Sequence, residues 1–323
     1  MRILVLGGSG FVGRTLAEQA VARGDTVTVF NRGRRDPVPG AHTLLGDRLA
    51  PGGLAALGGG TWDAVVDTWS AGAEPIEAAA RLLAGRAGHF TYVSSRSVYR
   101  YGQQAPLTEE GLLADPADPG YAGDKLRGEQ AAAAFGGPLL LARAGLILGP
   151  HEDVGRLPWW LRRLRRGGPA LAPGPRELPL QYVDARDLAG FVLDAAAAGH
   201  TGAYNVVSEP GHTTMGELLE TAAEVTGGRA ELRWAEPEVI LGAGIEAWTQ
   251  LPVWLPPGPE HDFMHRGDVS KALAAGLRCR PVRETVADTW AWLSALDGPA
   301  PLRTDRPPVG LDPEVEAKVL AGL

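Results

Sequence analysis

The chain has 323 residues, 45% hydrophobic and 21% charged, a composition typical of a globular protein with room for two domains. Its formal net charge of −7 argues against a protein that neutralises nucleic-acid phosphates, so no nucleic-acid partner is expected. No stretch approaches the roughly 18 consecutive apolar residues of a membrane span, and the N-terminus has no signal-peptide pattern. Together with a single cysteine, Cys279, these features predict a cytoplasmic protein without disulfides or membrane contact.

Residues 1–150 alternate between strand and helix patterns. The expected strands are residues 2–6, 26–30, 42–46, 63–68, 89–95 and 139–148. The expected helices are residues 11–23, residues 74–84 and a segment that begins at Tyr121. This alternation predicts an α/β fold built on a doubly wound parallel sheet, which binds ligands beyond the carboxyl ends of its strands.

The composition changes after Pro150, because seven of the nine tryptophans lie beyond it. A strand and a helix are expected within residues 180–196 and another strand at 203–208, and residues 180–208 should return to the first domain. Asp312 as N-cap and Pro313 as first helical residue predict a short C-terminal helix. The rest should form a smaller substrate-binding lobe of helices and loops, covering about residues 151–179 and 209–323.

A glycine-rich segment, "LGGSGFVG", joins the first expected strand to the first expected helix. Its glycines fit the dinucleotide fingerprint, in which a tight turn lets the backbone approach a pyrophosphate at a helix N-terminus. The position of the motif identifies residues 1–150 as a Rossmann-type dinucleotide-binding domain. Its predicted cofactor contacts are Gly7, Gly10, Phe11, Val12 and Gly13.

The end of the second expected strand indicates which dinucleotide is bound. Enzymes that prefer NAD place an acidic residue there to bind the ribose 2′-hydroxyl. This chain has Asn31 instead, followed by Arg32, Arg34 and Arg35. Guanidinium groups without a nearby carboxylate suit a 2′-phosphate. We therefore predict NADP, in its reduced form NADPH, as the cofactor, with NAD as the less favoured alternative. The predicted contacts are Asn31, Arg32 and Arg35.

Further motifs extend this pattern over most of the chain. They are "YVSSRSVY", "YAGDK", "LARAGLILGP", "YVDARDLA" and "DVSKALAAGLRCRPVRETVADTWAWL". With the glycine-rich loop, the chain resembles the short-chain dehydrogenase/reductase superfamily, in its extended or atypical NAD(P)-dependent epimerase/dehydratase branch. The similarity reaches to about residue 295.

The resemblance implies three catalytic residues, Ser95, Tyr121 and Lys125, with Ser94 or Ser97 as alternatives for the serine. Tyr121 and Lys125 stand one helical turn apart on the same face. A tyrosine with a solution pKa of about 10 needs a neighbouring cation to act near neutral pH. By resemblance, Ser95 polarises the substrate oxygen and Lys125 also bonds the nicotinamide ribose.

Other positions carry over with less force. Asp47 matches an acidic residue that contacts adenine in the family. Asp67 ends the fourth strand, where the family lines the cofactor, and it is included as a cofactor contact although Asp67 and Trp69 depart from the usual small residues there. Asp124 replaces the family's usual serine and should point away from Tyr121. No metal-binding residues are predicted.

The predicted function is NADPH-dependent reduction of a small-molecule carbonyl compound by a monomer or homodimer. A 4,6-dehydratase is disfavoured because Arg96 follows Ser95 where dehydratases carry acids. Two alternatives stay open, a nucleotide-sugar epimerase of the same family and a non-catalytic NADP-binding regulator. Trp159, Trp160, Trp248 and Trp254 could line an apolar pocket or simply fill the core.

Overall fold

The computed structural model describes residues 1–323, which divide into two compact units. Unit 1 comprises residues 1–145, 185–207 and 268–278, and unit 2 comprises residues 146–184, 208–267 and 279–323. The sequence-based division placed the boundary at residue 150 and returned residues 180–208 to the first domain. In the structure, residues 146–150 and 180–184 belong to unit 2, and a short segment near residue 270 also returns to unit 1.

Unit 1 is built on one sheet of seven parallel strands in the order β11-β6-β5-β4-β1-β2-β3. The strands are β1 (Arg2–Leu6), β2 (Thr26–Asn31), β3 (His42–Leu45), β4 (Ala64–Asp67), β5 (Phe90–Ser95), β6 (Leu139–Ala144) and β11 (Gly202–Val206). The direction of strand order reverses between β1 and β4. In doubly wound sheets such a switch point opens the crevice where ligands bind.

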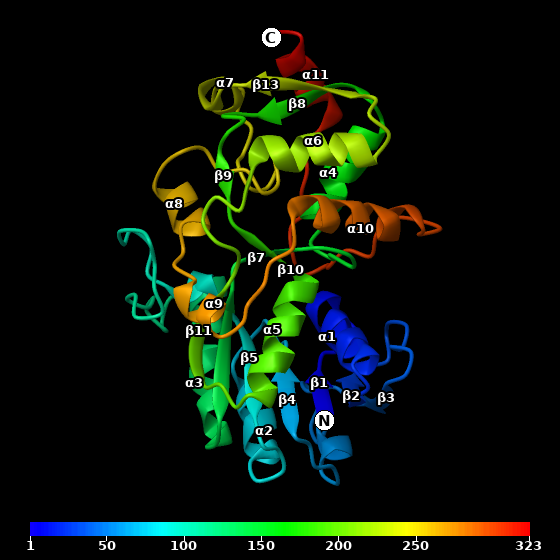
Figure 1. Ribbon diagram of the computed structural model, residues 1–323, viewed down its shortest axis with the longest axis vertical. Helices are drawn as coiled ribbons and strands as arrows, with labels where there is room; N and C mark the ends of the chain where they lie inside the picture. Colours follow the sequence, from blue (N-terminus) through cyan, green and yellow to red (C-terminus); the bar gives the residue numbers. More distant parts are fainter. The chain divides into compact units, whose positions relative to one another are not determined.

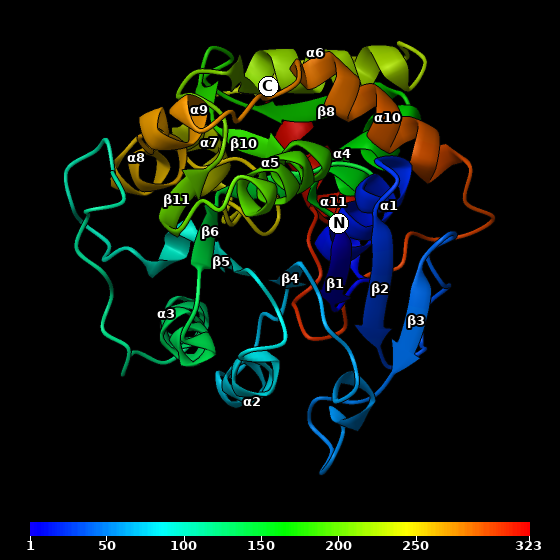
Figure 2. The same cartoon turned by 60° about the horizontal axis from the view of Figure 1, so that its bottom comes forward.

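Helices cover both faces of this sheet, as Figure 2 shows, with α1 and α5 on one side and α2 and α3 on the other. The α-helices of unit 1 are α1 (Phe11–Ala22), α2 (Glu74–Leu83), α3 (Tyr121–Ala132), α5 (Ala185–Ala197) and α9 (Ser270–Ala274). Single 3-10 turns are η1 (Ala55–Leu57), η2 (Arg96–Val98) and η3 (Ala133–Phe135). Strands β4 and β5 are buried throughout because each lies under helices on both sides. The expected doubly wound fold is confirmed.

The expected single strand over residues 139–148 is wrong. It is interrupted at Gly145, so that β6 belongs to unit 1 and β7 (Leu146–Leu148) to unit 2. A Cβ at Gly145 would lie 2.5 Å from the Val207 side chain, so the chain needs glycine there to pass β11. Residues 139–148 form a continuous, mostly apolar run in the sequence. The run is divided because β6 pairs with β5 and β11, whereas β7 pairs with a different strand of unit 2.

Unit 2 contains three small two-stranded sheets. β7 pairs with β10 (Tyr182–Asp184) in parallel, β9 (Pro179–Leu180) pairs with β12 (Thr213–Thr214) antiparallel, and β8 (Gly168–Pro173) pairs with β13 (Ala230–Ala235) in parallel. The helices are α4 (Arg156–Arg165), α6 (Met215–Val225), α7 (Pro237–Gly242), α8 (Pro259–His265), α10 (Val282–Ser294) and α11 (Pro313–Leu320). Figure 1 shows β8 and β13 side by side near α6 and α7. The expectation of helices and loops alone was wrong for β8 and β13, whose strand character depends on pairing across about 60 residues.

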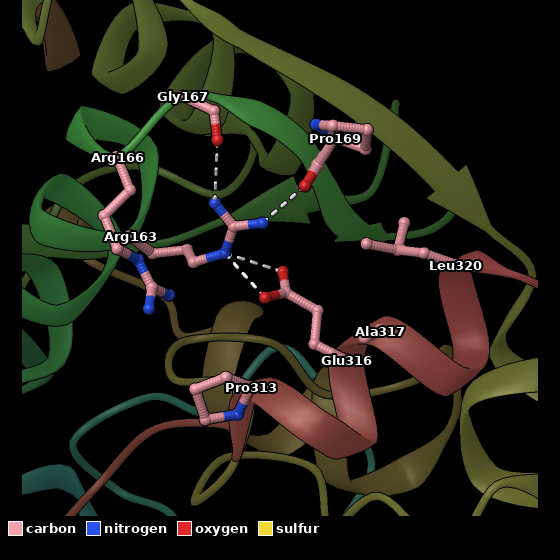
Figure 3. A pocket seen from close by; sticks show the side chains of 8 residues that line it. All are labelled: Arg163, Arg166, Gly167, Pro169, Pro313, Glu316, Ala317 and Leu320. Atoms are coloured by element: carbon pink, nitrogen blue, oxygen red, sulfur yellow. Dashed lines mark hydrogen bonds and ion pairs between the residues drawn. The ribbon is translucent and has the colours of Figure 1, made fainter.

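The C-terminal helix α11 is anchored to unit 2 by a buried ion pair. Glu316 accepts hydrogen bonds from Arg163 Nε, at 2.8 and 2.7 Å, and from the Leu171 backbone N–H at 3.1 Å. Arg163 also donates to the Gly167 and Pro169 carbonyl oxygens, and Figure 3 shows the guanidinium held among these acceptors. The predicted N-cap is confirmed, since Asp312 Oδ1 accepts the N–H groups two and three residues further on.

Candidate active site

The glycine-rich loop connects β1 to α1 at the switch point of the sheet. Gly7 has φ +90°, a conformation that favours glycine, and a Cβ there would lie 2.5 Å from Thr68 Oγ1. A Cβ on Gly13 would lie 2.4 Å from the Gly7 carbonyl oxygen, so the first turn of α1 packs directly on the loop. By contrast, nothing lies within 3.5 Å of a Cβ position on Gly10.

The N-terminus of α1 matches the requirements of a phosphate. Its N-cap is Gly10, which offers no side chain to its N–H groups, and the first turn has no acidic residue. Free N–H groups and the helix dipole together favour an anion at this position. Phe11, Val12 and Gly13 form that turn, so the loop residues predicted to hold a pyrophosphate fit that ligand.

The residues predicted to bind the adenosine ribose lie at the end of β2 and immediately after it. Asn31 is the last residue of β2, and its side-chain Oδ1 accepts the Gly33 N–H at 2.6 Å. Arg32 and Arg35 are exposed. Arg35 reaches back to the loop, because its Nη1 lies 3.9 Å from the position of a Cβ on Gly10. The structure thus brings a guanidinium next to the glycine loop and leaves the β2 terminus without a carboxylate.

Asp47 follows β3 and Asp67 ends β4, two strands that are separated in the sheet by β1 and β2, and the surroundings of the two carboxylates differ. Asp47, after β3, is half-buried and accepts the Leu49 N–H at 3.1 Å. Asp67, the last residue of β4, is fully buried, and its two oxygens accept from Arg48 Nη1 and Nη2, both at 2.7 Å. Because the Asp67 carboxylate is already paired, any cofactor contact there would come from the backbone around it.

Arg48 and Trp69 complete this wall of the site. Arg48 also donates to the Pro75 carbonyl at 2.6 Å, and its guanidinium lies 5.1 Å from the centre of the Trp69 ring. The Trp69 indole N–H donates to the Gly72 carbonyl at 3.0 Å. The unusual residues at the end of β4 therefore form a closed cluster with Arg48, which the sequence reasoning did not single out.

The serine-rich end of β5 provides the predicted substrate-oxygen partner. Ser95 is the last residue of β5, and its Oγ accepts the Ser97 N–H and donates to Ser97 Oγ, each at 3.1 Å. Arg96 follows it and is buried, and this burial lowers the pKa of its guanidinium to about 10. Ser94 points to the other side of the strand, where its hydroxyl donates to Glu129.

Tyr121 and Lys125 stand on one face of α3, one turn apart. Tyr121 opens the helix after Gly120 (φ +91°) and is 37% exposed, as a proton donor to a ligand would need to be. Lys125 is buried, with 3% of its surface exposed. Asp124 points away and pairs with Arg127.

The Lys125 ammonium reaches from α3 to the sheet. It donates to the Val93 carbonyl at 2.8 Å, the Trp69 carbonyl at 3.0 Å and the Tyr92 hydroxyl at 3.3 Å. Its nitrogen also lies 4.7 Å from the centre of the Tyr92 ring. Burial, with the nearby Asp67 and Tyr121, raises the pKa of Tyr92 well above its usual value, so Tyr92 stays neutral beside the cation.

Two further charged residues join this arrangement. Glu129 follows Lys125 by one turn on α3, and Arg143 lies on β6; both are buried and paired with each other. Neither residue was predicted from the sequence, although Tyr121, Lys125 and Glu129 follow one another at intervals of four residues.

The tryptophans considered for an apolar pocket separate into two groups. Trp160 and Trp254 are fully buried, and their indole N–H groups donate to the carbonyls of Pro252 and Gly174. They are core residues of unit 2. Trp159 and Trp248 are partly buried, and the Arg156 guanidinium lies 5.3 Å from the Trp248 ring centre. No helix in the structure has both the length and the apolar character to cross a membrane.

The chain is similar in sequence to known proteins. The sequence profile of the NAD dependent epimerase/dehydratase family matches residues 3–207. A 2-alkyl-3-oxoalkanoate reductase from Stenotrophomonas maltophilia is 31% identical over 225 residues, covering 61% of this chain and 66% of that protein, slightly less than two thirds of its length.

Solved structures with the same fold are also found. The Bordetella bronchiseptica enzyme WbmH, in complex with NAD+, has a TM-score of 0.71 at 20% identity, covering 92% of this chain and 99% of that chain. A Thermus thermophilus UDP-glucose 4-epimerase in complex with NAD has a TM-score of 0.66 at 21% identity, covering 92% of this chain and 100% of that chain. At these identities the likeness shows the fold.

Proposed function

The chain belongs to the NAD dependent epimerase/dehydratase family, an NAD(P)-dependent enzyme family, and on that premise we propose that it is an NADPH-dependent reductase of a small carbonyl compound. The observation that carries this proposal is the arrangement on α3. Tyr121, which is 37% exposed, is followed one turn later by the buried ammonium of Lys125, which donates to the carbonyls of Trp69, just after β4, and of Val93, in β5.

The cofactor preference rests on charge. A 2′-phosphate would find Arg35 beside the glycine loop and no carboxylate at Asn31. Gly7, Gly10 and the first turn of α1 would hold the pyrophosphate, while Arg32 and Asp47 would contact the adenosine end. NAD would meet no acidic partner for its ribose at the end of β2.

The protein side of the reaction follows from the three predicted catalytic residues. NADPH, when bound, supplies the hydride. Tyr121 would donate its hydroxyl proton to the substrate oxygen, and Ser95 Oγ would turn from Ser97 to hold that oxygen as negative charge develops on it. The Lys125 cation would stabilise the Tyr121 phenolate left behind. Because Lys125 is buried and held by two carbonyl oxygens, its charge is fixed in place.

The proposed substrate class is based on the similarity to the 2-alkyl-3-oxoalkanoate reductase. The name of that reductase describes a 3-oxoalkanoate with a 2-alkyl branch, and we propose a ketone of this kind, with apolar surface, as the substrate. A nucleotide-sugar epimerase is the alternative, favoured by the family that matches and by the fold shared with UDP-sugar epimerases. A regulator without catalysis would have no use for a buried lysine beside an exposed tyrosine. The cytoplasmic location, the monomeric or homodimeric state and the absence of nucleic-acid partners stay predictions.

The test is NADPH oxidation by the purified protein against a panel of ketones and aldehydes that includes 2-alkyl-3-oxoalkanoates. A UDP-sugar with NAD is run in parallel to detect epimerisation. Turnover of a ketone with NADPH supports the proposal. Conversion of the UDP-sugar without net cofactor oxidation would replace it with the epimerase, and NADPH binding with no turnover of any compound would favour the regulator.

A further inference from the structure

Glu129 continues the row formed by Tyr121 and Lys125 on α3. It stands eight residues after Tyr121 and four after Lys125, so all three lie on one face of the helix. Only 5% of its surface is exposed. An acidic side chain is rarely buried to this extent without a specific set of partners.

The partners of Glu129 lie on two strands of the sheet. Its Oε1 accepts from Ser94 Oγ on β5 at 2.6 Å and from Arg143 Nε on β6 at 3.0 Å, and its Oε2 accepts from Arg143 Nη2 at 2.9 Å. Arg143 is fixed in turn, because its Nη1 donates to the Tyr99 hydroxyl at 3.1 Å and to the Glu109 carbonyl at 3.2 Å. Although burial alone would lower the pKa of Arg143, its hydrogen bonds and charge interaction with Glu129 raise it, so Arg143 stays charged.

The hydrogen bonds of Glu129 fix the orientation of α3 relative to β5 and β6, whereas apolar packing would not. Ser94 immediately precedes Ser95, and Glu129 follows Lys125 by one turn, so the carboxylate joins the strand of the serine to the helix of the tyrosine and lysine. Side-on pairing of a carboxylate with a guanidinium fixes both distance and angle. A buried ion pair is a poor source of stability compared with apolar residues of similar volume, which leaves geometry as its main contribution.

We propose that Glu129, tied to Ser94 and Arg143, is a positioning residue that sets Tyr121 and Lys125 in register with Ser95. The proposal rests on the proposed function, in which these three residues act on one substrate oxygen. Misplacement by about 1 Å can cost about 100-fold in rate, so a clamp behind the catalytic face would have a large effect without touching the ligand.

The test compares Ser94→Ala, Glu129→Gln and a control, His89→Asn. Ser94→Ala removes only the link to β5 and keeps the Glu129–Arg143 pair. His89 is buried at the other end of β5 and bonds the His200 carbonyl at 2.8 Å, so its replacement also removes a buried polar contact. We expect kcat to fall about 10-fold in Ser94→Ala and about 100-fold in Glu129→Gln, with the NADPH Kd within threefold of wild type. The control should lose thermal stability and keep kcat.

A second readout needs no substrate. The pH at which the Tyr121 phenolate forms, followed by absorbance and obtained by subtracting the titration of Tyr121→Phe in each background, should change when the clamp is broken, because the distance from Tyr121 to the Lys125 cation then changes. If the wild type turns over no carbonyl compound, the proposed function fails and this titration still decides the clamp. Unchanged Tyr121 titration and unchanged kcat in both Ser94→Ala and Glu129→Gln would overturn the proposal.

Discussion

The ammonium group of Lys125 donates a hydrogen bond to the backbone carbonyl of Trp69, 56 positions earlier in the chain, at 3.0 Å. This bond joins the face of α3 that carries Tyr121 and Lys125 to the segment that follows β4. Trp69 is itself held by Arg48, which pairs with the buried Asp67. The predicted cofactor wall and the predicted catalytic helix therefore share one buried lysine.

Replacing Lys125 by methionine should destabilise the protein even without cofactor. The change leaves the carbonyls of Trp69 and Val93 without their donor in a buried position, and we expect a loss of about 2–4 kcal/mol in the free energy of unfolding. Lys271→Met is the matched control, because Lys271 makes a similar bond to the Ala203 carbonyl but is exposed. Urea unfolding measures both; equal losses in the two variants would contradict the structural role of Lys125.

Tyr121→Phe should abolish most turnover and leave cofactor binding intact. The ring stays, and only the hydroxyl proposed as proton donor is lost, so kcat should fall about 10²–10⁴-fold. Steady-state kinetics with NADPH and a ketone substrate, together with the NADPH Kd from fluorescence, separate the two effects. Near wild-type kcat in this variant would assign the proton to another group, with Ser97 the first candidate.

Arg35→Ala should reduce the preference for NADPH. Arg35 lies next to Gly10, and removing a charge-assisted contact to the 2′-phosphate should weaken NADPH binding about 10- to 100-fold while changing NADH binding little. Arg32→Ala should act in the same direction. Arg34→Ala is the control from the same exposed turn. If wild-type protein binds NADH as tightly as NADPH, the cofactor prediction is wrong.

Glu152 should make stability depend on pH. It is fully buried and accepts the backbone N–H groups of Arg156 and Leu157 at the start of α4. Burial raises its pKa from an ordinary value of 4.5 to about 7, even though Arg156 and the two N–H groups act in the opposite direction. The folded state therefore favours the protonated acid, so the contribution is fully present below about pH 4.5 and is lost as pH rises to about 7.

The size of this effect is about 3 kcal/mol, from about 1.4 kcal/mol per pKa unit. Unfolding free energies of wild type and Glu152→Gln are measured between pH 4 and 8, a range chosen to span both pKa values of about 4.5 and 7. As the pH rises across that range, the unfolding free energy of the wild type should fall relative to that of Glu152→Gln. A pH-independent difference would show that Glu152 has the same pKa in both states.

Glu316→Ala should detach the C-terminal helix and destabilise unit 2. It leaves the buried Arg163 charge unpaired, which typically costs about 3–5 kcal/mol. Asp312→Ala removes only the N-cap of the same helix and should cost about 1 kcal/mol. Thermal unfolding compares the two variants, and the prediction fails if removing the cap is as costly as removing Glu316.

Local sequence was sufficient for the glycine loop, the first helix and the tyrosine–lysine face. Each depends on neighbouring residues: Gly7 and Gly13 turn the chain between a strand and a helix, and residues four apart on a helix share a face. The C-terminal helix also followed from Asp312 and Pro313, because capping is a local interaction.

Only the tertiary structure decided which distant residues meet. The pairing of β8 with β13, the break at Gly145, the Asp67–Arg48 pair and the Glu129–Arg143 pair all join segments that are separate in sequence. The core positions of Trp160 and Trp254 likewise came from packing, since a tryptophan reads the same in sequence whether it fills a core or lines a pocket. Strand pairing and burial depend on the partner as much as on the residue itself, so no local pattern could have specified them.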